Sequence, residues 1–197
     1  MLSGKRVYGM GHFIFSNLFN LAGWEIEGQE NIPQQGPLIV VANHISNLDP
    51  PAVGSALNRR VHFVAKKELF EVPILGSILS HIGTLPIKRG KPDRQAIRAA
   101  LNILEEGEVL GLFPEGTRSK SGKLRRAKLG VVMIALKSKA PILPIGLVNT
   151  EKLFKEKIKI NIGQAFTLSD YYDKKLDKSE MREAGAEIMA KISELLE

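Results

Sequence analysis

Short apolar runs of strand length recur along this chain and alternate with segments that suit helices. The run at 38–42, Leu-Ile-Val-Val-Ala, is apolar at every position, which is typical of a central strand covered on both faces. Strands that alternate with helices predict an α/β layered domain, whose functional residues gather in loops beyond the strand ends. The other expected strands span 24–28, 61–65, 84–87, 109–113, 142–148 and 158–162.

Helix start and stop signals lie between these strands. Asp49 is followed by two prolines, which suits the N-cap of a helix. Gly107 suits the end of another helix. Asp177 and Glu180 are spaced as a capping box at the start of a C-terminal helix. The expected helices span 52–57, 70–82, 92–106, 129–137 and a last segment from 177 onward.

Length and charge limit the class of protein. A chain of 197 residues suits one folded domain. Lys and Arg outnumber Asp and Glu by 28 to 21, a net charge of +7, which favours nucleic acid, anionic lipid headgroups or phosphorylated substrates as partners. The absence of cysteine excludes disulfides, thiolate zinc sites and thiol nucleophiles. No segment has the roughly 18–20 consecutive apolar residues of a membrane-spanning helix, so we expect a protein that does not span a bilayer by itself.

The N-terminal segment 7–24 is rich in aromatic and aliphatic residues and follows two basic residues. It lacks a small-residue cleavage site, so it is not interpreted as a signal peptide. Two interpretations stay open, a helix packed on the core and an amphipathic helix lying in a lipid interface. The spread of aromatic residues over several helical faces favours the lipid interface, with Phe13, Phe15, Phe19 and Trp24 as anchors. We therefore expect an N-terminal interface helix over 1–23 and a catalytic domain over 24–197.

A histidine and a carboxylate directly follow the 38–42 strand, in the segment Asn-His-Ile-Ser-Asn-Leu-Asp at 43–49. A neutral imidazole is well suited to take a proton from a hydroxyl near neutral pH, and a carboxylate can orient it. This predicts His44 as general base and Asp49 as its partner. By themselves, however, the two residues can equally end a strand and cap a helix. Ser46 is a rival nucleophile, but it lacks the Gly-x-Ser-x-Gly surroundings of a nucleophile elbow.

Basic and polar residues follow three further strands. Lys66 and Lys67 come after the first, Lys88 and Arg89 after the second, and the segment Phe-Pro-Glu-Gly-Thr-Arg-Ser at 113–119 after the third. An arginine can direct two donors at a phosphate, although each group can also be ordinary solvated surface. The run from 118 to 128 holds six basic residues and no acidic one, and it suits either a solubilising loop or contact with anionic lipid.

Four segments, at 43–49, 83–90, 113–119 and 140–146, taken together and in this order, resemble the glycerolipid acyltransferase family. The resemblance is in particular to its bacterial 1-acyl-sn-glycerol-3-phosphate (lysophosphatidic acid) acyltransferases. The resemblance covers about residues 24–165 and is specific because the motifs occur together. It implies a single layered α/β domain with a mixed central sheet flanked by helices, like that of glycerol-3-phosphate acyltransferase. The four segments are NHISNLD at 43–49, GTLPIKRG at 83–90, FPEGTRS at 113–119 and APILPIG at 140–146.

The resemblance also implies a role for each site residue. His44 is implied as the general base on the free hydroxyl of the acceptor, and Asp49 as the residue that orients it. Lys66 is implied in holding the phosphate. The family uses no metal and no bound redox cofactor, since acyl-CoA or acyl carrier protein serves as co-substrate. The residues associated with acceptor binding are Arg89, Glu115, Gly116 and Arg118, with Thr117 beside them.

These features predict transfer of a fatty acyl group to the sn-2 hydroxyl of lysophosphatidic acid, which gives phosphatidic acid. The alternatives are another acceptor (glycerol 3-phosphate or a different lysophospholipid), a hydrolase, and a non-catalytic basic membrane-binding module. Nucleic acid is not an expected partner, because the basic residues accompany apolar segments and lack stacking aromatics. We expect peripheral or interfacial attachment to an anionic membrane surface at the cytoplasmic face of the cell membrane.

Overall fold

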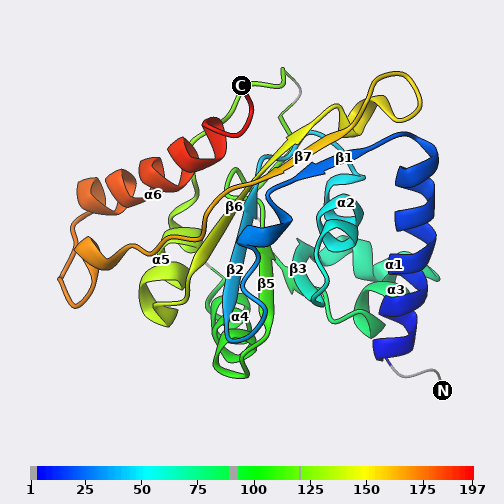
Figure 1. The fold of residues 1–197 in the computed structure, drawn as a ribbon. Coiled ribbons are helices and arrows are strands. Elements are labelled where there is room, and N and C mark those ends of the chain that lie inside the picture. Colours follow the sequence, from blue (N-terminus) through cyan, green and yellow to red (C-terminus); the bar gives the residue numbers. More distant parts are fainter. Residues whose placement is uncertain (1–3, 89–92, 120) are drawn as a thin grey trace.

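A seven-stranded sheet forms the centre of the computed structural model, which describes residues 4–88, 93–119 and 121–197 (Figure 1). The strand order is β1-β7-β6-β2-β5-β3-β4, and every neighbouring pair is parallel except the antiparallel pair β6–β7. The mixed sheet expected from the family resemblance is therefore confirmed. The strands are β1 (Glu25–Glu27), β2 (Leu38–Ala42), β3 (Val61–Lys66), β4 (Leu85–Ile87), β5 (Val109–Leu112), β6 (Ile142–Val148) and β7 (Lys159–Ile162).

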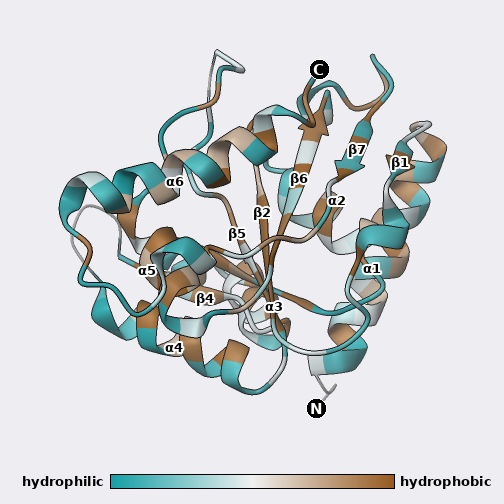
Figure 2. Ribbon diagram, turned by 60° about the vertical axis from the view of Figure 1, so that its left-hand side comes forward, coloured by the Kyte–Doolittle hydropathy of each residue, from teal (hydrophilic) through white to brown (hydrophobic). Residues whose placement is uncertain are grey.

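Helices cover both faces of this sheet, with α1, α2 and α3 on one side and α4, α5 and α6 on the other. Strand β2 is buried at every residue: Leu38, Val40 and Ala42 pack with α1 and α2, whereas Ile39 and Val41 pack with α4, α5 and α6. Side chains alternate across a strand, which explains its unbroken apolar run (Figure 2). The helices are α1 (Gly4–Leu21), α2 (Asp49–Ala56), α3 (Leu75–His81), α4 (Arg94–Glu105), α5 (Leu129–Ser138) and α6 (Lys178–Ser193).

Two of the expected helix boundaries are confirmed by their local chemistry. Gly107 ends the α4 region with a φ of 76°, a conformation that glycine adopts without steric cost. At the start of α6, Asp177 accepts from the Glu180 amide, and the Glu180 side chain accepts from the Asp177 amide. Four 3₁₀ helices complete the described structure: η1 (Gln29–Asn31), η2 (Lys67–Glu71), η3 (Thr150–Lys152) and η4 (Ser169–Tyr171).

Two of the expected helices differ from the structure. Helix α2 begins at Asp49 and its N-cap is Leu48, so the prediction of Asp49 as N-cap is wrong. The helix expected over 70–82 is divided into η2 and α3. Ile74 lies at the break with φ 66° and ψ −56°, and the Leu75 amide donates to the Pro73 carbonyl at 2.7 Å. Together these features define a strained γ-turn.

Helix α1 packs along α2 and α3. Phe19 is fully buried and stacks with Phe15 and Trp24, at ring-centroid distances of 6.2 Å and 5.2 Å. The expectation that Phe19 anchors the chain in lipid is therefore wrong, because this side chain belongs to the core. Phe13 differs, since 69% of it is exposed. Within the described residues, no helix combines the length and the apolarity needed to cross a bilayer.

Candidate active site

The carboxyl ends of parallel strands bring distant segments to one edge of the sheet. His44 follows β2, the segment 113–119 follows β5, and Thr150 follows β6. Strands β5 and β6 flank β2 on its two sides and both run parallel to it. The residues after these three strands therefore meet around His44, at the edge where ligand sites of open α/β sheets form.

The imidazole of His44 is held by Asp49. His44 Nδ1 lies 2.6 Å from Asp49 Oδ2, and the His44 side chain is 13% exposed. An ionised carboxylate only accepts hydrogen bonds, so Nδ1 carries the proton and Nε2 keeps its lone pair. Nε2 has no hydrogen bond to any residue that the structure describes. A largely buried imidazole whose tautomer is fixed and whose other nitrogen can accept a proton is the arrangement that a general base requires.

The Asp49 carboxylate is itself fully buried, and both of its oxygens are hydrogen-bonded. Oδ2 accepts from His44 Nδ1 and from the amides of Ile45 and Ser46, each of these two at 2.7 Å. Oδ1 accepts from the Thr150 hydroxyl at 2.5 Å. A buried carboxylate needs such donors because it has lost its hydration. The donors therefore take the place of that hydration and hold the Asp49 carboxylate beneath the imidazole.

The segment after β5 holds the backbone of His44. Glu115 Oε1 accepts from the His44 amide at 3.0 Å, and the Ser119 amide donates to the His44 carbonyl at 2.7 Å. The Phe113 ring lies against the imidazole, with centroids 4.2 Å apart and planes at 21°. The FPEGTRS segment thus fixes the main chain and the ring of His44 at once.

Glycine is required in this segment for a turn. Gly116 has a φ of 71°, and its amide donates to the Phe113 carbonyl at 2.9 Å. Such a φ is uncommon for other residues. A Cβ at this position would also lie 3.2 Å from Cγ of Lys128. The position of Gly116 therefore follows from the path of the chain, which must turn back toward His44.

A cavity of about 680 Å³ opens beside the histidine segment, and Thr117 and Arg118 line it. Arg125, which sequence reasoning did not single out, donates to the Thr117 hydroxyl at 2.7 Å. Asn43 and Ile45, the neighbours of His44, form part of the wall. Of the residues predicted to bind the headgroup, Thr117 and Arg118 are those that the cavity brings next to the histidine segment.

Two other residues predicted to bind the headgroup, Lys66 and Glu115, lie outside this cavity. Lys66 ends β3 and is partly buried, with 45% of its side chain exposed and its Nζ 3.4 Å from Glu68 Oε1. Glu115 is 1% exposed and does not line the cavity. Arg89 lies outside the described residues. Lys66 pairs in register with Ile87 at the end of β4, so Lys66 and Lys88, the residue after Ile87, leave the sheet at the same edge as His44.

Sequence reasoning missed two residues of the site. Phe113 belongs to the motif at 113–119 but was given no role of its own, and Thr150 was not singled out. Neither position carries a local signal, because each acts on a residue far away in the sequence: Thr150 and Asp49 are 101 positions apart. In the described part of the chain, no group of three or more His, Asp or Glu side chains has an arrangement suited to a metal ion.

Comparison with known proteins identifies the family. A family model described as "Acyltransferase" matches residues 23–148. A 1-acyl-sn-glycerol-3-phosphate acyltransferase of Bacillus subtilis is 34% identical over 155 residues, which are 76% of this chain and 76% of the relative. The chain belongs to the acyltransferase family. The resemblance found in the four sequence motifs is thereby confirmed.

Two further proteins show how much of the chain and of the fold is similar. The chloroplastic 1-acyl-sn-glycerol-3-phosphate acyltransferase BAT2 of Brassica napus is 36% identical over 132 residues, which cover 66% of this chain and 38% of the relative. The crystal structure of the 1-acyl-sn-glycerophosphate acyltransferase PlsC from Thermotoga maritima matches with a TM-score of 0.75 and 27% identity. That match covers 98% of this acyltransferase chain and 79% of PlsC.

Burial also shapes the electrostatics of Glu115. Loss of hydration raises the pKa of its carboxyl above the ordinary value, against the opposing effect of the hydrogen bond from the His44 amide. Glu115 Oε2 is buried and has no hydrogen-bond partner among the described residues. A raised pKa means that folding favours the protonated form of this side chain.

This linkage predicts how stability depends on pH. The stabilising contribution of Glu115 is complete below the unfolded carboxyl pKa of about 4.3 and is lost as pH rises through the raised folded pKa. Glu115→Gln keeps an oxygen that can accept from His44 but cannot ionise. The free energy of unfolding of this variant, measured by urea titration across acidic and neutral pH, should therefore improve relative to wild type as pH rises. A difference between the two proteins that is constant with pH would contradict the assignment.

Proposed function

We propose that this acyltransferase moves a fatty acyl group from a thioester donor to the sn-2 hydroxyl of 1-acyl-sn-glycerol 3-phosphate, giving phosphatidic acid. The observation that carries the proposal is the 2.6 Å contact of His44 Nδ1 with buried Asp49, which leaves Nε2 without a hydrogen bond to any residue that the structure describes. The proteins compared above that bear this activity in their names support the choice of acceptor. The donor is acyl-CoA or acyl carrier protein, with no metal or redox cofactor.

In the proposed reaction, His44 is the general base and Asp49 orients it. Nε2 takes the proton of the acceptor hydroxyl as the oxygen attacks the thioester carbonyl. The tetrahedral intermediate then expels the thiolate, the new ester forms, and the imidazolium returns its proton to the sulfur as the thiol leaves. Asp49 stays ionised and stabilises the imidazolium between these steps. Ser46 takes no covalent role in this scheme, because its hydroxyl accepts from the Leu48 amide at 3.1 Å in the turn.

Basic residues around His44 would hold the acceptor phosphate. Arg118 and Thr117 line the cavity whose wall includes the neighbours of His44, and Lys66 ends β3 at the same sheet edge. Arg89 is proposed to bind the phosphate as well, because it matches the arginine of the second family motif. Gly116 contributes backbone geometry to this site, and Glu115 contributes by holding the His44 main chain. Fixing the phosphate places the attacking hydroxyl against Nε2, and such positioning can lower a barrier by several kcal/mol, on the order of 7 or more in well-oriented cases.

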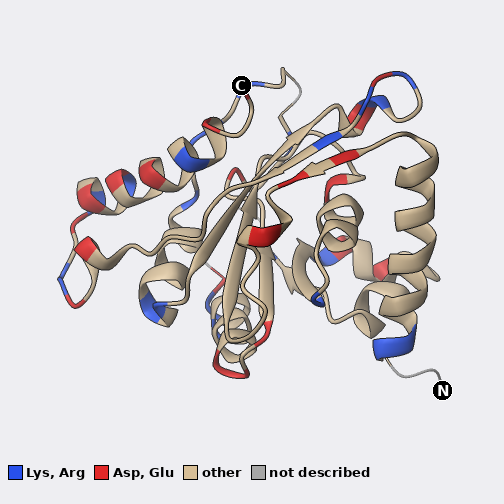
Figure 3. Cartoon of the chain, in the orientation of Figure 1, with Lys and Arg blue, Asp and Glu red and all other residues tan. Residues whose placement is uncertain are grey.

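We further propose peripheral attachment to an anionic membrane, at the cytoplasmic face of the cell membrane, through α1 and α3. Helix α1 carries no charge beyond its first turn, where Lys5 and Arg6 lie, whereas α6 carries charges of both signs (Figure 3). The γ-turn presents Ile74 with 79% of its surface exposed. Exposed apolar groups rimmed by cations suit anionic lipid. The exposed apolar residues of these elements are Met10, Phe13, Ile14, Leu21, Leu69, Val72, Ile74, Leu75 and Ile78.

The acyl transfer is tested with purified protein, lysophosphatidic acid and either acyl-CoA or acyl carrier protein loaded with a fatty acid. Phosphatidic acid should form, and His44→Ala should lower the rate on the order of a thousandfold or more because the general base is gone. Mass spectrometry of the lipids measures both. An acceptor without phosphate, 1-acylglycerol, serves as the control for headgroup binding and should be used poorly.

Three outcomes would contradict this proposal. A folded His44→Ala protein that still transfers acyl groups would exclude the mechanism. Free fatty acid formed without any lysolipid would favour a hydrolase. Preference for glycerol 3-phosphate or another lysophospholipid would replace the acceptor while leaving the family assignment in place.

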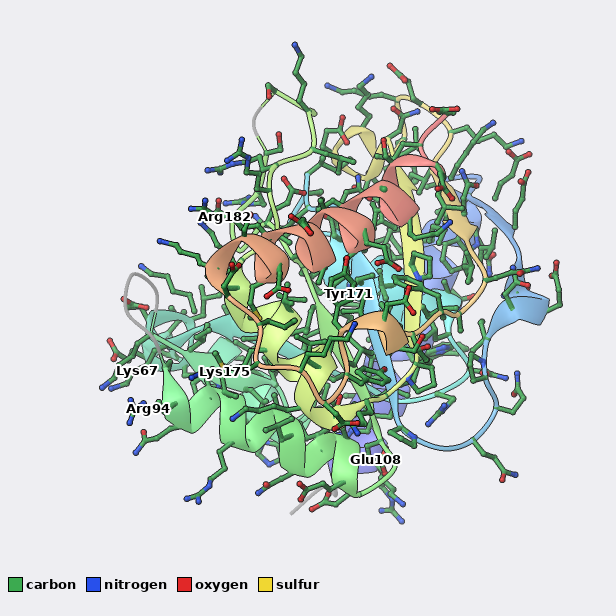
Figure 4. The ribbon with its side chains drawn as sticks, turned by 90° about the vertical axis from the view of Figure 1, so that its left-hand side faces the viewer. Lys67, Arg94, Glu108, Tyr171, Lys175 and Arg182 are labelled. Atoms are coloured by element: carbon green, nitrogen blue, oxygen red, sulfur yellow. The ribbon has the colours of Figure 1, made fainter. Side chains whose placement is uncertain are left out.

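Membrane attachment is tested by flotation with vesicles of phosphatidylglycerol and of phosphatidylcholine. Wild type should float with the anionic vesicles, and the double variant Phe13→Ser/Ile74→Ser should lose most of that binding because it removes exposed apolar surface. Arg182→Ser, on the face covered by α6 (Figure 4), is the control and should bind as wild type does. Equal flotation of the wild type and the double variant would contradict the proposed surface.

A further inference from the structure

The Thr150 hydroxyl makes a contact that the reaction scheme above leaves unused. It donates to Asp49 Oδ1 at 2.5 Å, and both side chains are fully buried. We infer that Thr150 is a positioning residue of the catalytic pair, which fixes Asp49 so that Asp49 can fix His44. This inference rests on the proposed function of the His44–Asp49 pair.

The two carboxylate oxygens of Asp49 depend on different parts of the chain. Oδ2 accepts its hydrogen bonds from residues 44–46, which lie within five positions of Asp49. Among the described residues, Oδ1 has Thr150 as its single donor. A carboxylate that is held at one oxygen can still rotate about its Cβ–Cγ bond, because this torsion is broad. The Thr150 hydroxyl fixes the second oxygen and thus the plane of the carboxylate.

Strand β6 brings Thr150 to this position. The Asn43 side chain bridges to β6, since its Oδ1 accepts from the Leu147 amide at 2.7 Å and its Nδ2 donates to the Leu147 carbonyl at 2.8 Å. The end of β6 is thereby tied to the residue that precedes His44. The histidine segment and the Thr150 segment are held at a fixed distance by this side chain.

The turn after β6 then directs Thr150 inward. Asn149 has a φ of 62° and a ψ of 18°, a left-handed conformation that asparagine tolerates better than most residues. Its Nδ2 donates to the Lys157 carbonyl at 3.1 Å, and its carbonyl accepts from the Lys152 amide at 2.9 Å. These bonds stabilise the reversal at which η3 begins. Thr150 is the first residue of η3 and the buried one, whereas Glu151 is exposed.

A purely structural role for Thr150 makes a different prediction from a positioning role. A hydroxyl that only satisfies a buried oxygen would affect folding stability and leave the chemistry of folded molecules intact. A hydroxyl that orients Asp49 affects the step in which His44 takes a proton. Removal of such an interaction lowers kcat more than it raises KM, because it acts on the transition state and not on ground-state binding.

The experiment compares Thr150→Val and Thr150→Ser with wild type and with Ser138→Ala, which removes a partly buried hydroxyl at the end of α5, outside the site, that donates to the Ala135 carbonyl at 3.4 Å. Valine keeps the shape of threonine without the hydroxyl, and serine keeps the hydroxyl without the methyl group. We expect Thr150→Val to lower kcat for transfer to lysophosphatidic acid by roughly tenfold or more, with KM for the acceptor within about twofold. Thr150→Ser should recover most of the activity, and Ser138→Ala should retain kcat while it reports the general cost of removing a hydrogen-bonded hydroxyl.

A second readout does not depend on turnover. The imidazole N–H proton of His44, which lies in the 2.6 Å contact with Asp49, is followed by proton NMR in each variant. Its downfield resonance should shift or broaden in Thr150→Val and return in Thr150→Ser. If Thr150→Val does not fold, Thr150→Ala carries the same expectation, because it also lacks the hydroxyl.

Two results would overturn the inference. One is a Thr150→Val protein, or its Ala substitute, with wild-type kcat and an unchanged His44 resonance. The other is a Thr150→Ser protein that loses as much kcat as Thr150→Val, which would assign the effect to packing of the methyl group. Absence of transfer by the wild type would instead count against the proposed function, and the NMR comparison would still test the positioning role.

Discussion

A carboxylate without exposed surface needs hydrogen-bond donors in place of water, and the fold supplies these to Asp49 from two segments. The turn at 44–46 surrounds Oδ2, and the loop after β6 covers Oδ1. The strand order makes this possible, because β6 lies directly beside β2 and runs parallel to it. The sheet therefore determines the position of the carboxylate, and the carboxylate in turn determines the tautomer of His44.

The segment after β5 completes the support of His44 from the other side of β2. Its backbone and the Glu115 side chain hold the amide and the carbonyl of His44, and the Phe113 ring packs on the imidazole. Two motifs that are about 70 residues apart in sequence thus form a single structural unit. Thr117 and Arg118 continue this segment into the cavity. The same loop therefore contacts the proposed base and lines the space proposed for the headgroup.

Many of the helices and strands could be predicted from the sequence, because the signals for them lie within each segment. The apolar run of β2 and the capping box of α6 predicted those elements directly. The contacts made across the sheet could not be predicted in the same way. Asp49 matched the pattern of an N-cap, but its carboxylate accepts hydrogen bonds from the turn that precedes the helix and from the His44 ring. Phe19 matched a lipid anchor, yet its environment depends on Trp24 and on the sheet beneath it. Thr150 had no detectable pattern, since its partner lies across the sheet.

In the proposed reaction, the negative charge of Asp49, held under His44, stabilises the imidazolium formed during acyl transfer. The most direct measurement is kcat of Asp49→Asn, because asparagine keeps the shape and the acceptor oxygen but removes the charge. We expect a folded protein whose kcat is lower by roughly a hundredfold or more, with little change in KM for the acceptor. A folded Asp49→Asn protein that retains kcat within about tenfold of the wild-type value would show that acyl transfer does not depend on this charge.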